Sequence, residues 1–590
     1  MRKVLSRCSV AGALLASVAG VALVDVAPVG AAPAQAGAGN EYVVVYADGA
    51  SAADARQAIT ASGGTVVSEN ADVGVATVQS SDGNFEAKVD GQAAIEGSAK
   101  NRVIGSVPKT GSTTDRAKKF DEAEAEGRAP RGASNGKGHG PKPSAEPLAD
   151  LQWDMQQIGA TVDGSYRVSQ GRGVKVGIID TGVDGSHPDI APNFDKADSR
   201  NFTVDIPVDA NGDPIDGPCE DEPDKSCNDA ADVDEDGHGT HVASTIASPL
   251  NGLGIGGVAP QATIVNLRAG QDSGYFFLQP SVDALTYAGR NGIDVVNMSY
   301  YVDPWLFNCA NHPADSPADQ AEQRAIVKAM QRALDYAHAH GVTLVSAAGN
   351  GATDYTKVIS DASSPDFASE PGEAPKVRDL LDPKSCISMP SEGNHVISVS
   401  STGPSLRKAY YSDYGNGYID VAAPGGDAYD TPTGDLDYGQ TVLAAYPKSL
   451  AVANGELDAN GDPVVPYVVK SCDAKGTCAY YQYLQGTSMA SPHATGVAAL
   501  IVGRWGQTDR RGQKSLYPDL VGWVLAASAD KTPCPTPPTV TYTRRVPQAD
   551  GSVIVRTSSA TCEGGTNRNG FYGHGVIDAN AAVGGGHRRD

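Results

Sequence analysis

The sequence predicts an α/β fold with a largely parallel central sheet. From about residue 148 onward, short apolar runs alternate with segments of helix-forming composition. The apolar runs are residues 174–179, 263–267, 293–298, 342–347 and 395–400, and the clearest helical segment is 318–340. Strands that alternate with helices form a mostly parallel sheet covered on both faces. Active-site residues would then gather at the carboxyl ends of the strands.

A smaller unit precedes this region. Residues 41–107 read as β-α-β-β-α-β, with strands at 41–46, 65–68 and 74–79 and helices at 51–61 and 85–90. Residues 108–147 then lose almost all large apolar side chains and are rich in Gly, Pro and charge. We interpret them as a flexible, protease-sensitive linker. The main domain is expected over 148–586, followed by a short tail at 587–590.

The N-terminus predicts secretion. Met1-Arg2-Lys3 is positive, an apolar stretch follows from Val10, and Ala34-Gln35-Ala36 is a plausible cleavage signal. These are the three parts of a signal peptide, which we place at residues 1–36. The apolar run is short, and no later segment is long and apolar enough to span a bilayer, so we expect no membrane anchor.

Charge and cysteine content fit an extracellular protein. The 590 residues carry a formal charge of −24, which argues against a nucleic-acid partner and favours a solvated acidic surface. Of the nine cysteines, Cys8 lies within the proposed signal peptide, leaving eight, an even number. Sequence proximity predicts disulfides between Cys219 and Cys227, Cys309 and Cys386, Cys472 and Cys478, and Cys534 and Cys562. The absence of any C-x-x-C pair disfavours zinc.

Two identical hexapeptides, 209–214 and 458–463, lie in insertions. The first resembles the start of an EF-hand calcium loop, but Pro214 stands where that loop needs Gly. Asn-Gly between short apolar runs is also a hairpin-turn signal. We predict a hairpin turn at both positions.

Three segments together carry the chemistry. Asp180 ends a buried strand, His238 lies in Asp-Gly-His-Gly-Thr-His, and Ser488 lies in Gly-Thr-Ser-Met-Ala. A serine hydroxyl needs an imidazole to take its proton, and the imidazole needs a buried carboxylate to fix its tautomer. Taken singly, each segment is also compatible with a purely structural role, as a helix cap or a turn. The order Asp, His, Ser is that of subtilisin, and the Gly-x-Ser-x-Gly elbow of lipases is absent.

At these residues the chain resembles the subtilisin-like (subtilase) serine peptidases. Asp180-Thr-Gly, His238-Gly-Thr-His-Val-Ala and Gly486-Thr-Ser488-Met-Ala-Ser-Pro-His match the three signature blocks of that family. The resemblance implies a subtilisin-like three-layer fold, serine endopeptidase activity without a cofactor for the chemistry, and structural roles for His241 and His493. It further implies that residues 37–107 are an inhibitor-like propeptide.

The same resemblance assigns further site residues. Ala-Ala-Gly349-Asn350 matches the segment that supplies the oxyanion-hole asparagine, so Asn350 would pair with the Ser488 N–H. Ser299, Tyr300, Tyr301 and Gly349 match positions that bind substrate, although Tyr301 replaces a glycine of the compact members. Asp189 and Asn251 match a family calcium site, so a structural calcium ion is expected there.

The sequence thus predicts a secreted, monomeric serine endopeptidase acting on proteins or peptides, with its own propeptide as an intramolecular inhibitor. One alternative is a non-enzymatic secreted binding protein, which loss of a triad residue would have signalled. The other is a processing peptidase of narrow specificity, which would need a defined acidic pocket. The acidic insertion before His238 is a candidate for such a pocket, or for a cation site, but we favour a solvated loop.

Overall fold

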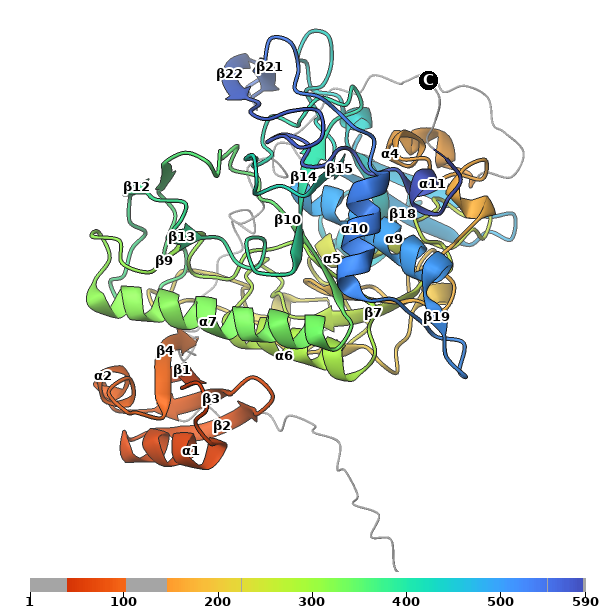
Figure 1. Cartoon of the computed structure of the whole chain (residues 1–590). Coiled ribbons are helices and arrows are strands. Elements are labelled where there is room, and N and C mark those ends of the chain that lie inside the picture. Colours follow the sequence, from red (N-terminus) through yellow and green to blue (C-terminus); the bar gives the residue numbers. More distant parts are fainter. Residues whose placement is uncertain (1–39, 102–145, 224, 549, 587–590) are drawn as a thin grey trace, which may run out of the picture. The chain divides into compact units, whose positions relative to one another are not determined.

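The computed structural model of the chain describes residues 40–101, 146–223, 225–548 and 550–586 (Figure 1). The predicted signal peptide, most of the linker and the tail lie outside these residues. A seven-stranded, entirely parallel sheet forms the centre of the main domain. Its strands, in spatial order, are β15 (Val421–Pro424), β14 (Val396–Thr402), β10 (Thr343–Ala347), β8 (Val295–Met298), β5 (Lys175–Ile179), β7 (Thr263–Arg268) and β6 (Arg200–Asn201).

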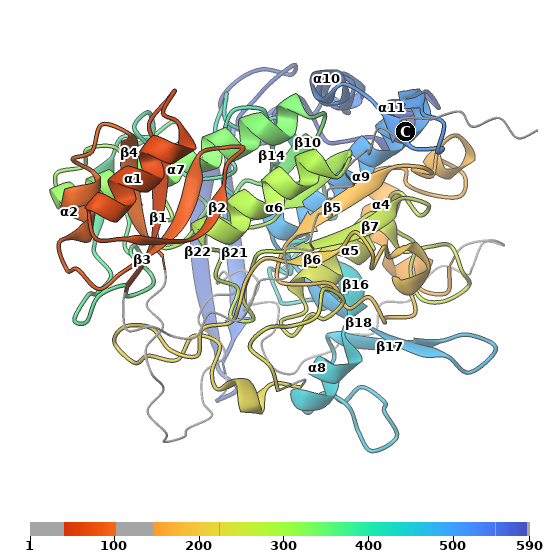
Figure 2. The same cartoon turned by 90° about the horizontal axis from the view of Figure 1, so that it is seen from below.

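Helices cover both faces of this sheet, because its strands are apolar on both faces. Val176 and Ile178 of β5 pack into the same apolar cluster as residues of α5 (His238–Ala247) and α9 (Thr487–Trp505). Ile179 faces the opposite cluster, with residues of α6 (Leu278–Arg290) and α7 (Pro317–Ala339) (Figures 1 and 2). The predicted three-layer α/β fold is confirmed, and each predicted strand of the sheet is present.

Shorter elements decorate the main domain. They include α4 (Trp153–Gln157), α8 (Lys448–Ala453), α10 (Pro518–Ser528) and α11 (Ala579–Ala582), and an antiparallel sheet of β16 (Val442–Tyr446), β18 (Cys478–Leu484) and β17 (Val468–Cys472). Two-stranded pairs are β9 (Asn308–Cys309) with β13 (Cys386–Ile387), β11 (Ile359–Asp361) with β12 (Arg378–Leu381), β19 (Gln507–Thr508) with β20 (Lys514–Ser515), and β21 (Thr539–Pro547) with β22 (Val553–Thr561).

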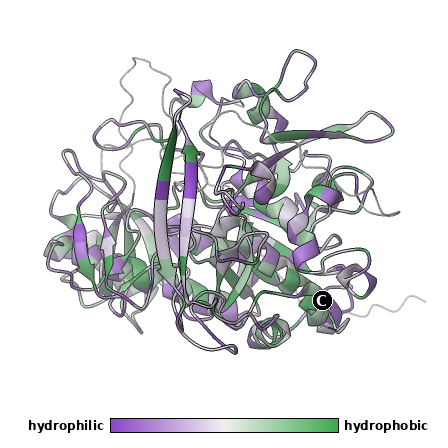
Figure 3. Cartoon of the chain, turned by 90° about the horizontal axis from the view of Figure 1, so that it is seen from above, coloured by the Kyte–Doolittle hydropathy of each residue, from purple (hydrophilic) through white to green (hydrophobic). Residues whose placement is uncertain are grey.

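The long β21–β22 hairpin carries hydrophobic and hydrophilic segments along both strands (Figure 3). Val553, Ile554 and Val555 are exposed on it. The two predicted hairpin turns are also confirmed, since bridges join Val208 to Pro214 and Leu457 to Pro463. No helix among the described residues is long and apolar enough to cross a membrane.

The N-terminal unit has the predicted element order. It comprises β1 (Asn40–Tyr46), α1 (Ala52–Ala61), β2 (Thr65–Asn70), β3 (Val75–Ser80), α2 (Phe85–Val89) and β4 (Ile95–Asn101), with an antiparallel sheet in the order β2-β3-β1-β4. Alternate residues of β1 face opposite sides. Val44 packs with α1 and α2, whereas Val43 and Val45 share an apolar cluster with Ala325 and Ala329 of α7.

Polar contacts surround this apolar seam. The Asn70 amide donates to Asp283 Oδ1 and Thr286 Oγ1 of α6, both at 2.7 Å. Asp48 pairs with Lys328 at 2.8 Å and also with Arg332, both on α7. The outer face of the small sheet is therefore attached to α6 and α7 of the main domain.

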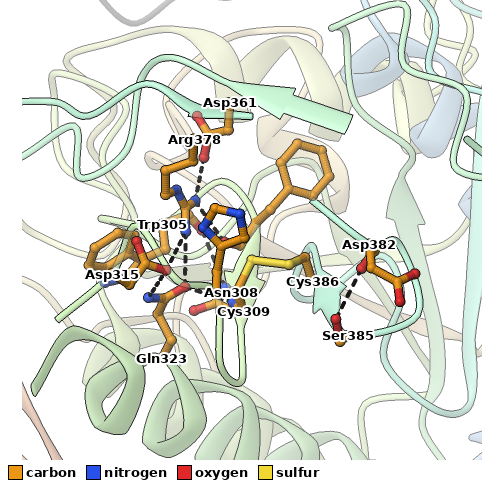
Figure 4. Close-up of a disulfide and its surroundings, with 12 residues drawn as sticks. Trp305, Asn308, Cys309, Asp315, Gln323, Asp361, Arg378, Asp382, Ser385 and Cys386 are labelled. Carbon is orange, nitrogen blue, oxygen red and sulfur yellow. Dashed lines mark hydrogen bonds and ion pairs between the residues drawn. A yellow bond between two sulfur atoms is a disulfide. The ribbon is translucent and has the colours of Figure 1, made fainter. Parts of the chain in front are cut away.

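All four disulfides join the predicted partners. Cys309–Cys386 ties β9 to β13 and closes the insertion that contains Arg378 (Figure 4). The Arg378 guanidinium is fully buried over the ring of Trp305, pairs with Asp361, and lies 3.3 Å from Asp315 Oδ2. This ion-pair network and the disulfide fix the insertion beside α7.

Candidate active site

Asp180 follows β5 at the carboxyl edge of the sheet. Its side chain is fully buried, and its Oδ1 lies 2.7 Å from His238 Nδ1. The same oxygen accepts a hydrogen bond from the Thr181 N–H at 2.8 Å. These contacts leave the other ring nitrogen of His238, Nε2, as the one that can serve as a base.

The loop that carries His238 is organised by Asp234, a residue that our sequence analysis did not single out. Asp234 Oδ1 accepts from the Gly237 N–H and Oδ2 accepts from the Thr240 N–H, both at 2.9 Å. Gly239 lies so close to Gly182 that an added Cβ would be 2.0 Å from the Gly182 carbonyl oxygen. The small residues around Asp180 and His238 thus permit the close approach of their backbones.

Ser488 lies in the first turn of α9, which begins at Thr487. Ser299, which follows β8, donates from Oγ to the Ser488 carbonyl at 3.0 Å, and Ser488 Oγ lies 3.4 Å from the Ser299 carbonyl oxygen. Ser488 is 6% exposed. Because α9 packs against α5, the helices carrying Ser488 and His238 are neighbours.

Asn350 follows β10 and is oriented by Thr487. Its Oδ1 accepts from the backbone N–H and the hydroxyl of Thr487, each at 2.8 Å. The amide nitrogen therefore points to the side away from Thr487. Gly349 has a φ of +114°, and an added Cβ would lie 2.3 Å from Asp413 Oδ2, so glycine is required for this turn.

A pocket opens beside Ser488 and Asn350. All four predicted substrate-binding residues, Ser299, Tyr300, Tyr301 and Gly349, line it. Tyr300 stacks on Phe276 with ring centroids 4.1 Å apart, and the Tyr301 hydroxyl donates to Asp366 Oδ2 at 2.6 Å. Sequence analysis missed further lining residues, which come from distant segments: Thr353, Tyr355, Ser388, Ser391 and Asp413.

Burial dominates the electrostatics of Asp180. Desolvation raises the pKa of its carboxyl, and the adjacent His238 ring opposes this rise. The charged carboxylate is therefore best supported when the imidazole beside it carries a proton. This is the electrostatic coupling that a general base needs when it takes a proton from a hydroxyl.

Two other histidines near the site make structural contacts. His241 Nε2 lies 3.1 Å from the carbonyl oxygens of Val442 and Gln482, and burial lowers its pKa to about 3. His493 lies 2.9 Å from Asp154 Oδ2 and 2.8 Å from the Met489 carbonyl. Both rings hold neighbouring segments together.

The residues around Asp189 and Asn251 do not fit a calcium ion. Asn251 Oδ1 accepts from the Leu253 N–H at 2.8 Å, so its amide nitrogen faces Asp189 Oδ1 at 3.0 Å. Asp189 Oδ2 accepts from the Ile255 N–H at 3.1 Å and from the Tyr481 hydroxyl at 3.0 Å. Hydrogen-bond donors thus surround this carboxylate, whereas calcium requires oxygen ligands directed at the ion.

The structure combines a parallel sheet in an α/β fold, a buried Asp–His pair, and a serine in the first turn of a helix at the carboxyl edge of the sheet. This combination defines the class of subtilisin-like serine peptidases. Comparison with known proteins agrees. The model of the subtilase family of peptidases matches residues 171–510, more than half of the chain, and this range contains Asp180, His238 and Ser488. The chain therefore belongs to the subtilase family, whose members are serine-type endopeptidases.

Subtilisin DY of Bacillus licheniformis is 26% identical over 340 residues, which are 57% of this chain and 79% of that protein. Fervidolysin of Fervidobacterium pennivorans is 27% identical over 364 residues, which are 60% of this chain but 38% of that protein.

Among solved structures, the epidermin leader peptide processing serine protease of Staphylococcus aureus gives a TM-score of 0.57 at 20% identity. That match covers 94% of this chain and 100% of the other. It shows the shared fold.

Proposed function

We propose that the chain is a secreted endopeptidase that cuts peptide bonds through an acyl-enzyme on Ser488. The observation that carries this proposal is the 2.7 Å contact between Asp180 and His238, next to the helix that presents Ser488. His238 would take the Ser488 hydroxyl proton as the oxygen attacks the peptide carbonyl, and would then return it to the leaving amine. Water would then attack the acyl group, with His238 taking the proton of the water and returning it to the Ser488 oxygen as the acyl group leaves.

Asn350 and the Ser488 N–H would stabilise the oxyanion of each tetrahedral intermediate. The Thr487 contacts that hold Asn350 Oδ1 support this role, because they direct its NH₂ group away from Thr487. The first N–H groups of a helix have no acceptor within the helix, and the N–H of Ser488 belongs to this set. Ser299, Tyr300, Tyr301 and Gly349 would position the substrate.

Covalent labelling tests this function directly. A fluorophosphonate or sulfonyl fluoride reagent is expected to modify Ser488, because His238 makes its oxygen nucleophilic. Mass spectrometry of the digested protein would locate the label. Ser491→Ala, which changes a buried serine of the same helix, should retain labelling. Equal labelling of wild type and Ser488→Ala would show that the nucleophile is elsewhere.

We further propose that residues 37–107 are a propeptide that inhibits the enzyme within the same chain until the linker is cut. The attachment of the small sheet to α6 and α7 supports this role. Secretion is supported by the four disulfides, since such bonds persist in oxidising compartments. We propose a monomer that acts on proteins or peptides, as its family does.

The mature chain is expected to begin between about Pro108 and Leu148. From Glu146 onward the chain is bonded to the main domain, since the Glu146 carboxylate accepts from the Gly252 N–H at 2.7 Å and the Leu148 N–H donates to the Gly254 carbonyl at 2.8 Å. Cleavage should depend on Ser488. N-terminal sequencing of secreted wild type and Ser488→Ala checks this, and wild type that still starts near Gly37 would contradict it.

A further inference from the structure

The pocket beside Ser488 lies on the acyl side of the bond that would be cut. The described residues that line it include Ser488 and Asn350 but not His238. In the proposed mechanism the peptide carbonyl carbon bonds to Ser488 and its oxygen faces Asn350, whereas the leaving amine receives its proton from His238. The side chain that enters the pocket therefore belongs to the residue whose carbonyl is attacked, which is the P1 residue.

A carboxylate forms part of the wall of this pocket. Asp413 is 4% exposed, and it is the one charged side chain among the described lining residues. Its Oδ1 accepts from the Thr353 N–H at 2.6 Å, and its Oδ2 lies 3.3 Å from the Tyr355 hydroxyl oxygen. A Cβ on Gly349 would lie 2.3 Å from Asp413 Oδ2, so only a glycine there lets the carboxylate come this close. The hydrogen bonds that the carboxylate accepts favour its charged form.

Two further carboxyl groups lie behind the lining. Glu392 accepts from the N–H of Ser388, a lining residue, at 2.7 Å. Burial raises the pKa of Glu392 to about 8, and the charge of Asp413 adds to this rise. At another wall, the Tyr301 hydroxyl donates to Asp366 Oδ2 at 2.6 Å. Acidic groups thus surround the pocket on more than one side.

A buried lysine offsets only part of this charge. Lys408 interacts with Asp413 but is not one of the described lining residues. Its ammonium group donates to the carbonyl oxygens of Ala409 and Ser412, at 2.9 and 2.6 Å. Burial lowers the pKa of Lys408 to about 7, so at neutral pH the lysine is only partly charged. The pocket therefore keeps a negative potential.

We propose that this pocket selects lysine or arginine at P1, with Asp413 as the counter-charge of the substrate side chain. The inference rests on the proposed endopeptidase function and names its substrate class. The hydroxyl groups of Tyr355, Ser388 and Ser391 also line the pocket and would accept the remaining N–H groups of the cation. A neutral side chain would displace water from Asp413 without supplying a positive charge, which is unfavourable.

This assignment changes which residues form the acidic pocket of a peptidase with narrow specificity. The sequence offered the insertion before His238 as a candidate, whereas the structure brings Asp413 to the pocket beside Ser488. Asp413 follows β14, far along the chain from that insertion.

The chain itself carries bonds of the expected kind. Residues 108–147, where maturation is proposed, contain eight lysine and arginine residues. After incubation of the purified chain, N-terminal sequencing is expected to show a new end directly after one of them, and Ser488→Ala should stay uncut. Cuts that depend on Ser488 but follow only neutral or acidic residues would overturn the proposal.

Four peptides that differ only at P1, with arginine, lysine, glutamine or methionine there, give the direct test. The parent should cut the arginine and lysine peptides with a kcat/KM about 100-fold higher than the other two, or more. Asp413→Asn keeps the shape of the side chain and an oxygen for the Thr353 N–H. It should lower this ratio by about tenfold or more and cut the neutral peptides as fast as the parent. Asp379→Asn, which changes an exposed carboxylate of β12, should keep the parent's ratio.

Labelling by a fluorophosphonate shows whether Asp413→Asn is folded with its triad intact, and its rate should equal that of the parent. The inference is overturned if the parent cuts all four peptides alike, or if the labelled Asp413→Asn keeps the full preference. The ratio measured for the parent and the position of the linker cut do not depend on this variant. If no peptide is cut and Ser488 is not labelled, the endopeptidase function itself fails, and this inference fails with it.

Discussion

Replacing either Ser488 or His238 with alanine is expected to lower kcat by about 10⁴-fold or more, and combining the two should cost little beyond the larger single effect. The reason is geometric. His238 is held by Asp180 at 2.7 Å, and its one chemical task is to move the proton of Ser488. Once the nucleophile is absent, the base has nothing to activate, so the two losses are not additive.

The measurement is kcat on a peptide substrate for the parent, both single variants and the double variant. His340→Ala serves as a control, because His340 is exposed at the end of α7 and precedes β10, whereas Asn350 follows the opposite end of that strand. Its turnover should equal that of the parent. Multiplicative losses in the double variant would mean that Ser488 and His238 act independently, contrary to the mechanism proposed here.

Replacing Asn350 with alanine should lower kcat by about 10²–10³-fold and leave KM little changed. Ser488 remains activated by His238 in this variant, so labelling by a fluorophosphonate should persist. What is lost is a donor whose best hydrogen bond forms only in the transition state. The Thr487 N–H and hydroxyl hold the Asn350 amide in this orientation before substrate arrives, each at 2.8 Å.

Steady-state kinetics that separate kcat from KM test this expectation. Asn291→Ala, which changes an exposed asparagine after α6, is the matched control and should behave like the parent. A variant of Asn350 whose KM rises while kcat holds would assign the side chain to substrate binding. That result would remove Asn350 from the oxyanion hole.

Local patterns predicted the sheet and the core of the candidate site. Five of the seven strands lie in the predicted apolar runs, whereas the edge strands β6 (Arg200–Asn201) and β15 (Val421–Pro424) were not predicted. Asp180, His238 and Ser488 each lie in a distinctive short motif. The disulfide pairs were predictable for a similar reason, because each cysteine pairs with its neighbour along the chain. These features depend on residues that are close in sequence or on a single periodicity.

Contacts between distant segments could not be predicted in this way. The Tyr481 hydroxyl donates a hydrogen bond to Asp189, although the two residues are 292 positions apart in the sequence. This hydrogen bond is one of those that surround the Asp189 carboxylate, where calcium was expected. Asp413 approaches Gly349 because β14, the strand that precedes the Asp413 segment, is the neighbour of β10 in the sheet. Nothing in a linear pattern marks which of many acidic residues will be buried together, as Asp205 and Asp229 are beside Arg268.

The seam between the N-terminal sheet and helices α6 and α7 has a consequence for how activity would depend on dilution. While the chain is uncut, the linker of residues 108–147 keeps the small domain at a high local concentration beside its own seam. After a cut in the linker the same contacts must form between two molecules. The small domain could then dissociate, and only contacts such as those of Val43 and Val45 with α7 would hold it in place. Salt would weaken the exposed Asp48–Lys328 ion pair by screening the two charges. The amount of uninhibited enzyme would therefore be set by concentration and ionic strength rather than by the cut alone.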